Sequence, residues 1–242
     1  MQLLLIRHGK STWNLQNKFT GWHDVDLAQD GVLEAKKASE LIQQLNIIPS
    51  ICFTSYLKRA QKTLEIILSN FRIEDIKDLE IFKSWKLNER HYGSLQGLDK
   101  NETKIKFGNE QFLKWRRSYD IQPPPLDEES PMNPENDPLY KDISEKLPLT
   151  ECLKDTYERV IPYWSNSILP SLKNNIVLIV AHGNSLRALC KHLFNLNDDE
   201  IISLEIPTGN PLLINLDKSC KIISASYLDK NRAENLPKFM EK

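Results

Sequence analysis

The sequence predicts an α/β fold, a three-layer sandwich with a mostly parallel central sheet. Two short segments, residues 3–9 and 177–183, have the same design, in which an apolar run is followed closely by a His-Gly pair. A continuous apolar run of this length before a helical pattern is typical of a buried parallel strand. Because ligand sites in open α/β sheets lie beyond the carboxyl ends of the strands, we expect His8 and His182 at one edge of the sheet.

The other elements follow in chain order. Apolar residues at helical spacing predict helices over residues 32–45, 57–67 and 186–193. Short apolar runs predict strands over residues 51–54, 79–82, 176–181, 211–216 and 222–227. We expect Ser55 to cap the second helix, whereas Ala28 precedes the first helix and offers no capping side chain. Strands that alternate with helices indicate the α/β class.

The stretch of residues 96–146 is interpreted as an inserted lid within a single domain that spans residues 1–242. The polar segment 122–148 holds most of the 13 prolines and has no useful periodicity. Segments of this kind inside a compact domain are usually lids, insertions or partly disordered loops. We therefore expect the insertion to cover the edge of the sheet.

Composition favours a cytoplasmic globular protein. A net charge of −1 gives no support for a nucleic-acid surface, so any basic chemistry must be local. No apolar run approaches the roughly 18 residues that a membrane helix requires. The chain enters a strand directly, without the charged region or cleavage site of a secretory signal. The four scattered cysteines form no C-x-x-C pair, which favours free thiols in a reducing compartment.

Residues Arg7, His8 and Gly9 form the first candidate site. A histidine at a strand end can be a nucleophile when one ring nitrogen is fixed as a donor and the other keeps its lone pair. Arg7 offers a planar fork for phosphate, and Gly9 lets the backbone approach an anion closely. His182 repeats this geometry and could stabilise a transferring phosphoryl group. For an isolated R-H-G tripeptide, a hydrogen-bonded histidine beside a surface arginine is the more frequent explanation.

Charged residues elsewhere add further candidates. Arg59 lies in the first turn of a helix, where a cation opposes the helix dipole. A residue that is locally unfavourable in this way often marks a functional site. The alternative for Arg59 is a solvated side chain. Glu89 is a candidate general acid or base, and its alternative is an ion pair with Arg90. Arg116 and Arg117 could clamp a carboxylate or phosphate, or form an ordinary basic helix face.

Taken together, these residues resemble the cofactor-dependent phosphoglycerate mutases of the histidine phosphatase superfamily. The resemblance runs from about residue 3 to residue 227. R-H-G marks only the superfamily, whereas S-W-K-L-N-E-R-H-Y-G at 84–93 and H-G-N-S-L-R-A-L at 182–189 are specific to the mutases. Shorter matching blocks lie at 19–22, 24–27, 54–55, 57–60, 115–117, 147–151, 159–164 and 206–209.

The resemblance implies a role for each matching residue. His8 would be the nucleophile that 2,3-bisphosphoglycerate phosphorylates as primer, and Glu89 would donate and accept protons. Arg7, Arg59 and His182 would surround the transferring phosphoryl group. The substrate-binding positions would be Ser11, Asn14, Thr20, Gly21, Arg90, Tyr92, Lys100, Arg116, Arg117, Gly183 and Asn184.

The same resemblance implies the reaction and its partners. It implies the interconversion of 3-phosphoglycerate and 2-phosphoglycerate without a metal. The partners would be small phosphorylated three-carbon acids, with no nucleic acid and no membrane, and the protein would be a homodimer. Water must be kept from the phosphoryl group during transfer. The inserted segment and the tail from Asp229 are the expected covers.

The chain departs from the family pattern at three places, the first being Ala28, which replaces the usual Ser or Thr before the helix of residues 32–45. Lys10 stands where the family usually has Glu or Gln, and we expect it to strengthen anion binding. The tail after Tyr227 is shorter than in the family, so closure of the site is expected to differ. A phosphatase or a bisphosphoglycerate synthase on the same scaffold is one rival, although Ser11 argues against the synthase, which carries glycine there. A non-catalytic binding protein is the other rival, against which His8 and Glu89 argue.

Overall fold

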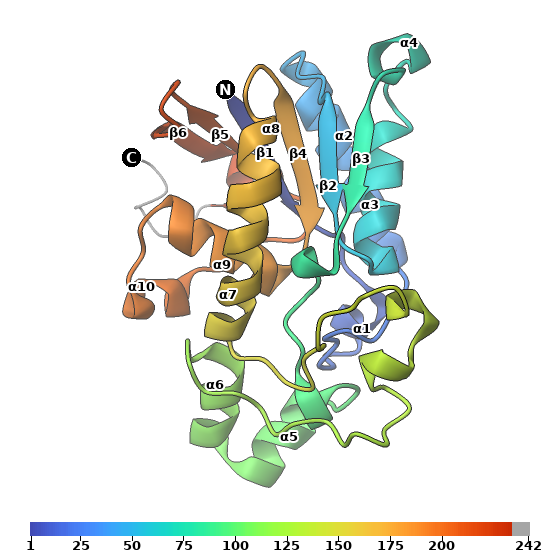
Figure 1. Cartoon of the computed structure of the whole chain (residues 1–242), viewed down its shortest axis with the longest axis vertical. Helices are drawn as coiled ribbons and strands as arrows, with labels where there is room; N and C mark the ends of the chain where they lie inside the picture. The colour runs from blue at the N-terminus through green and yellow to red at the C-terminus, as the bar shows by residue number, and fades with distance from the viewer. Residues whose placement is uncertain (234–242) are drawn as a thin grey trace.

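The computed structural model describes residues 1–233 and has a six-stranded sheet at its centre (Figure 1). The strand order is β3-β2-β4-β1-β5-β6. The strands are β1 (Gln2–Arg7), β2 (Ile51–Thr54), β3 (Glu80–Lys83), β4 (Ile176–Ala181), β5 (Leu212–Leu216) and β6 (Ile222–Tyr227). The first four run parallel, and β5 is antiparallel to both β1 and β6. The predicted α/β class with a mostly parallel sheet is confirmed.

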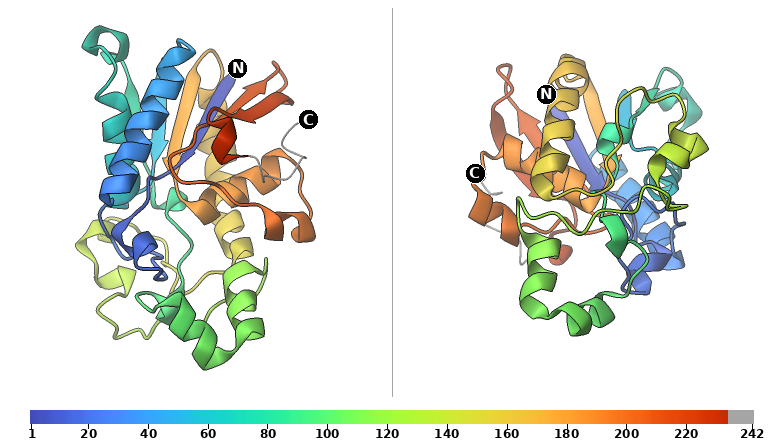
Figure 2. Two further views of the ribbon diagram at one scale, coloured as in Figure 1. Left: turned by 180° about the vertical axis from the view of Figure 1, so that it is seen from behind. Right: turned by 60° about the horizontal axis from the view of Figure 1, so that its bottom comes forward.

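Helices cover both faces of the sheet, as the two opposite views in Figures 1 and 2 show. One face carries α2 (Gln29–Gln44) and α3 (Lys58–Leu68), and the other carries α7 (Leu153–Tyr163) and α9 (Gly183–Leu193). Side chains alternate along β1, because successive residues of a strand point to opposite faces. Leu3 and Leu5 therefore join the core beneath α7 and α9, while Leu4 and Ile6 join the core beneath α2 and α3.

The inserted segment lies beyond the carboxyl ends of the parallel strands, below the arrowheads in Figure 1. It begins with α5 (Lys100–Phe107) and α6 (Asn109–Arg117), and its remainder holds only short 3₁₀ turns at Pro134–Asn136 and Pro138–Tyr140. The smaller helices elsewhere are α1 (Thr12–Leu15), α4 (Ile73–Ile76), α8 (Leu169–Ser171) and α10 (Asp198–Ser203). The function of residues 96–146 as a lid stays a prediction.

The prediction for the start of α3 is wrong. Leu57 occupies the N-cap position and no side chain caps the helix. The hydroxyl of Ser55 accepts a hydrogen bond from Leu57 N–H at 3.1 Å and contacts Nε2 of His182 at 2.7 Å. The helix begins later than expected, so this hydroxyl does not cap it. It contacts His182, the residue that follows the neighbouring strand β4. Ala28 is the N-cap of α2 without a capping bond, as predicted.

Two glycines fix the loop after β1 against the start of α2. A Cβ atom on Gly9 would lie 2.2 Å from the carbonyl oxygen of Gly31, and one on Gly31 would lie 2.1 Å from that of Lys10. Such distances are far inside van der Waals contact, so only glycine allows this approach. The packing holds the residues that follow β1 in place beneath the carboxyl end of the sheet.

The structure describes all four cysteines, and it describes the tail as far as residue 233. Cys52, Cys152 and Cys190 are buried free thiols, and Cys220 is an exposed one. Within the described residues, no helix is both long and apolar enough to cross a membrane. Arg232 donates to the carbonyl of Thr208 at 2.6 Å. The rest of the predicted cover, residues 234–242, lies outside the described residues.

Candidate active site

Strand pairing brings the two predicted histidines together. Arg7 at the end of β1 pairs with Ala181 at the end of β4, and the N–H of His8 donates to the carbonyl of Ala181 at 2.9 Å. The ring centroids of His8 and His182 are 4.9 Å apart. The shared edge expected from the two His-Gly junctions is therefore present.

His8 presents the lone pair of Nε2 toward Arg59. Its Nδ1 lies 2.7 Å from the carbonyl oxygen of Gly9, which can only accept, so we assign the ring hydrogen to Nδ1. The Nε–H of Arg59 points at Nε2 from 3.4 Å. Burial, and then the charges of Arg59 and Arg7, hold the pKa of His8 well below its ordinary value. The ring is therefore neutral at pH 7, which is the form in which Nε2 can act as a nucleophile.

Two arginines, a buried one and a half-buried one, flank this ring from different elements. Arg59 on α3 donates to the carbonyls of Gly21 at 2.7 Å and His23 at 3.0 Å, and only 1% of the residue is exposed. Burial lowers its pKa to about 10, which still leaves the guanidinium charged at pH 7. Arg7 donates from Nη1 to the carbonyl of Ile206 at 3.0 Å. Backbone carbonyls thus fix both guanidinium groups beside His8.

Glu89 is held by backbone N–H groups. Its Oε1 accepts from the N–H of Arg90 at 2.8 Å and from that of Asn184 at 3.0 Å, in the first turn of α9. A helix N-terminus favours a negative charge at this position. The alternative ion pair is absent within the described residues, because the guanidinium of Arg90 donates to the carbonyls of Trp115 and Arg116, both at 3.1 Å.

His182 lies behind His8 and is fully buried. Its Nε2 is 2.7 Å from the hydroxyl of Ser55. Burial, followed by the charge of Arg59, holds the pKa of His182 well below its ordinary value. Its Nδ1 is buried and has no hydrogen-bond partner among residues 1–233.

A cavity of about 170 Å³ opens in front of these groups. Seven of its lining residues are arginine or lysine, and only Glu89 and Glu205 are acidic. The chain as a whole carries a net charge of −1, so the positive charge is local, as expected from the composition. Predicted site residues that line the cavity are Arg7, His8, Asn14, Thr20, Gly21, Arg59, Glu89, Tyr92, Lys100, Arg116, Arg117, Gly183 and Asn184.

Unpaired donors around the cavity indicate an anionic ligand. Within the described part of the chain, Nε of Arg7, Oγ1 of Thr20 and Nε of Arg187 are buried without a partner. Buried polar groups are nearly always hydrogen-bonded, and unpaired ones call for an explanation. Among residues 1–233, no group of three or more His, Cys, Asp or Glu side chains is placed to hold a metal ion.

Comparisons with known proteins place nearly the whole chain in one superfamily. The model of the histidine phosphatase superfamily (branch 1) matches residues 3–225. The 2,3-bisphosphoglycerate-dependent phosphoglycerate mutase of Maricaulis maris is 54% identical, over 98% of this chain and 97% of its own length. That of Parabacteroides distasonis is 48% identical, over 99% of this chain and 95% of its own. This chain belongs to the 2,3-bisphosphoglycerate-dependent phosphoglycerate mutase family.

Solved structures of the superfamily share the fold. Mycobacterial hydrolase 1 superposes with a TM-score of 0.69 at 20% identity, covering 93% of this chain and 95% of its own. Bacillus stearothermophilus YhfR superposes with a TM-score of 0.66 at 21% identity, covering 91% of this chain and 93% of its own. At such identities the similarity establishes the architecture alone.

Three residues assigned from the mutase resemblance do not line the cavity: Ser11, Arg90 and His182. Ser11 is the N-cap of α1, and its hydroxyl accepts from the N–H of Asn14 at 3.2 Å. Arg90 is wholly buried beneath Tyr92, with its guanidinium 4.4 Å from the centre of that ring. These two side chains contact cavity residues, and the ring of His182 lies beside that of His8, with the ring centroids 4.9 Å apart.

Lys10 does not line the cavity, so its expected effect on anion binding stays a prediction. Its Nζ lies 3.5 Å from Oδ2 of Asp30, outside the residues that line the cavity of this mutase-family chain. The backbone explains the placement. Lys10 N–H donates to Glu34 at 2.8 Å and its carbonyl accepts from Ala28 at 2.9 Å, so the residue is tied to the start of α2.

The structure adds cavity residues that sequence reasoning did not single out: Lys18, Phe19, Arg187, Leu204, Glu205 and Ile206. Arg187 could have been found, because it follows Asn184 by three residues on α9 and so shares its face. Its Nη1 donates to Oδ1 of Asn184 at 2.8 Å. Glu205 has no comparable signal, because the loop after α10 reaches the mutase-family site only through the tertiary fold.

Proposed function

We propose that this chain interconverts 3-phosphoglycerate and 2-phosphoglycerate through a phosphohistidine at His8, with 2,3-bisphosphoglycerate as primer. The observation that carries the proposal is the shared cavity, because His8 and Glu89 both line it among seven cationic side chains. Relatives 54% and 48% identical to this chain are named for the corresponding mutase. Substrate and primer carry several negative charges, which a cluster of fixed cations attracts.

His8 attacks phosphorus through Nε2, forming the N–P bond while the bond from phosphorus to the glycerate oxygen breaks. The hydrogen bond from Nδ1 to the carbonyl of Gly9 holds the ring in the required orientation and tautomer. Bound in the cavity, the primer supplies the phosphoryl group that His8 carries. Covalent transfer keeps this group on the protein while the glycerate changes its orientation.

Fixed donors stabilise the charge that develops on the transferring phosphoryl oxygens. Arg59 already points Nε–H at Nε2 of His8, and Nε of Arg7 has no partner within residues 1–233. Ser55 can donate its hydroxyl hydrogen to Nε2 of His182, which leaves Nδ1–H of that ring as a donor. These three groups make up the phosphoryl site.

Glu89 moves the proton. The glycerate oxygen that leaves phosphorus takes a proton, and the hydroxyl that attacks His8-bound phosphorus in the second half-reaction gives one up. Oε1 of Glu89 is occupied by two N–H groups, so Oε2 performs this exchange. A Cβ atom on Gly183 would lie 3.6 Å from Oε2 and 3.5 Å from Cζ of Arg7, so these groups converge at the start of α9.

The remaining cations suit the carboxylate and the second phosphate. Lys100, Arg116 and Arg117 reach the cavity from the inserted segment, whereas Arg7 and Arg59 reach it from the sheet and α3. Ligand binding therefore joins the inserted segment to the core. We propose that residues 96–146 act as a lid that excludes water during transfer.

The decisive experiment follows 3-phosphoglycerate conversion in excess EDTA, with and without 2,3-bisphosphoglycerate, while free phosphate is measured in parallel. Isomerisation that requires the primer and survives the chelator supports the proposal. Phosphate release without isomerisation would establish the rival phosphatase. His8→Asn is expected to abolish both reactions, and His192→Asn, which changes an exposed histidine outside the cavity, is the matched control.

We also propose a cytoplasmic homodimer. The edge strand β3 is exposed along its length, with Ile81 and Phe82 46% and 42% exposed. Proteins usually cover or disrupt an apolar edge strand, and a second copy of this chain would do so. Light scattering should give twice the chain mass for the unmodified protein and a single chain mass for Phe82→Asp.

A further inference from the structure

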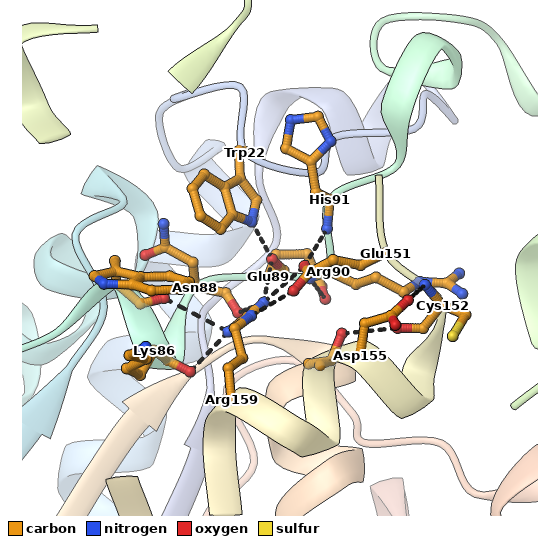
Figure 3. A network of polar contacts seen from close by, with 12 residues as sticks. Trp22, Lys86, Asn88, Glu89, Arg90, His91, Glu151, Cys152, Asp155 and Arg159 are labelled. Carbon is orange, nitrogen blue, oxygen red and sulfur yellow. Dashed lines mark hydrogen bonds and ion pairs between the residues drawn. The ribbon is translucent and has the colours of Figure 1, made fainter. Parts of the chain in front are cut away.

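Arg159 on α7 lies beneath the segment that carries Glu89, and Figure 3 shows its guanidinium surrounded by backbone oxygens. Nη1 donates to the carbonyl of Lys86 at 2.7 Å. Nη2 donates to the carbonyls of Asn88 at 3.1 Å and Glu89 at 3.0 Å. One side chain thus binds three carbonyls within four consecutive residues, including that of Glu89 itself.

Glu151 fixes this guanidinium and binds the other side of the same segment. Its Oε1 accepts from Nε of Arg159 at 2.6 Å and its Oε2 from Nη2 at 3.0 Å, with the two side chains 2% and 7% exposed. Oε2 also accepts from the N–H of His91 at 2.7 Å, and Glu151 N–H donates to the carbonyl of His91 at 2.8 Å. The pair therefore holds the backbone on both sides of Glu89.

The segment has no regular structure that could hold it instead. A 3₁₀ turn ends at Leu87 and the next begins at Gly93, so residues 88–92 lie between elements. Buried backbone groups outside helices and sheets must find side-chain or water partners. Apart from this pair, the Glu89 carbonyl accepts from Nε1 of Trp22 at 2.5 Å.

We propose that Arg159, fixed by Glu151, is a positioning residue that sets the location of the Glu89 carboxylate for proton transfer. The inference rests on the proposed function, since it assigns Glu89 the proton. A buried ion pair by itself is weak evidence of stabilisation, so the argument depends on where the hydrogen bonds go. A misplacement of about 1 Å at a reacting group can cost about 100-fold in rate.

The inference predicts a loss in kcat with little change in KM. Arg159→Met should lower kcat about 100-fold and change KM less than threefold, because the cations that bind substrate belong to other elements. Arg159→Lys keeps the charge but presents one point of donation, so we expect an intermediate kcat. Glu151→Gln keeps the shape of the anchor and should lower kcat less than Arg159→Met.

A matched control is available on α9. Lys191 is 11% exposed and donates to the carbonyl of Leu196 at 2.7 Å and to Asp198 at 2.8 Å, away from Glu89. Like Arg159→Met, Lys191→Met removes a largely buried cation that binds a backbone carbonyl and a carboxylate. We expect it to lower Tm and to leave kcat unchanged.

Hydrogen exchange tests the positioning apart from the catalytic assay. Amides of residues 88–92 should exchange at least tenfold faster in Arg159→Met and Arg159→Lys than in the unmodified protein and Lys191→Met. Unchanged exchange there would overturn the inference, and so would faster exchange with an unchanged kcat. If the unmodified protein had no mutase activity, the proposed function would fail, while the exchange result would still decide whether Arg159 places Glu89.

Chemical rescue provides a readout that a general loss of stability would not give. A cavity of about 540 Å³ lies beside the pair and is lined by Arg159, Glu151, Trp85 and Thr150 among others. Millimolar guanidinium should therefore reach the space left in Arg159→Ala and raise kcat at least fivefold. The same salt should leave Lys191→Met unaffected. Equal responses in the two variants would count against a positioning role.

Discussion

Arg117 on α6 forms an ion pair with Glu205, which lies in the loop after α10, and both residues line the cavity. The pair links the inserted segment to the core of the molecule. In this pair the carboxylate of Glu205 occupies Arg117, a cation that is expected to bind substrate. Hydrogen bonding to Arg117 holds the pKa of Glu205 below its ordinary value, so this carboxylate is charged at neutral pH. An anionic substrate must therefore compete with Glu205 for Arg117.

Glu205→Gln should tighten substrate binding. The Glu205 side chain is 65% exposed, so solvent screens the pair, and exposed pairs contribute only about 0.2–1 kcal/mol. The KM for 3-phosphoglycerate should fall about two- to fivefold at low salt, and the difference should shrink as the ionic strength rises. Steady-state kinetics at two salt concentrations measure both effects.

The control for this prediction lies on the same helix. Glu110 pairs with Lys114 at 2.7 Å on α6, and neither residue lines the cavity. Glu110→Gln should leave the KM unchanged at both salt concentrations. A KM that rises in Glu205→Gln would mean that the pair organises Arg117 for substrate rather than competing with it.

Arg59→Met should slow phosphorylation of His8 and change its pH dependence. Burial is the largest cause of the low pKa of His8 and Arg59 the second, so the variant raises that pKa part of the way to its ordinary value. More of the ring is then protonated in mildly acidic solution, and the acidic limb of the rate profile moves to higher pH. The lost Nε–H donor should lower the rate at least 100-fold.

Rapid-quench measurement of phosphohistidine across pH 5–8 checks both effects. Lys58→Met is the control, because Lys58 precedes Arg59 on α3 but is exposed and pairs with Asp24 at 3.8 Å. A limb at the same pH in Arg59→Met and Lys58→Met would show that burial alone sets the protonation of His8.

The fold and the first members of the site could be predicted because their signals are local. Apolar runs that end at His8 and His182 encode strand ends, and adjacent parallel strands bring those ends together. Glu89 sits in irregular backbone, yet its block is distinctive enough to carry a family resemblance. Local sequence thus indicates which residues come together at the candidate site.

The supporting contacts could not be predicted, since each joins residues distant in sequence. Glu205 approaches Arg117 across 88 positions, and Arg159 approaches Glu89 across 70. Ser55 is a further example. The local pattern predicts a helix cap there, but the hydroxyl contacts His182, which is 127 residues away. Tertiary packing decides which partner a polar side chain takes.

The stability of the protein should fall in mild acid because of three buried histidines. Burial, and then neighbouring arginines, lower the pKa of His8, His91 and His182, that of His91 to about 3. In the unfolded chain these groups titrate near about 6.5. Between the folded and unfolded pKa values the unfolded state binds more protons, so the free energy of unfolding falls as the pH drops below about 6.5.

Each such histidine costs about 1.4 kcal/mol per pH unit in that range. Urea unfolding at pH 7.5, 6.5 and 5.5 measures the slope. His8→Asn removes one of the groups and should reduce the loss between pH 6.5 and 5.5 by about 1 kcal/mol, because the unfolded imidazole is only half protonated at the upper pH. His192→Asn replaces an exposed ring and should change the slope less. Equal slopes in the two variants would contradict a neutral, buried His8.

Lys10→Met should have little effect on substrate binding, although the residue lies two positions from His8. Its ammonium faces Asp30 at the start of α2, with the side chain 37% exposed, so its field at the cavity is screened. We expect the KM for 3-phosphoglycerate to change less than twofold. Lys18→Met is the informative comparison, because Lys18 lines the cavity and its loss should raise the KM several-fold. Equal increases in the two variants would show that Lys10 turns toward the ligand when the site is filled.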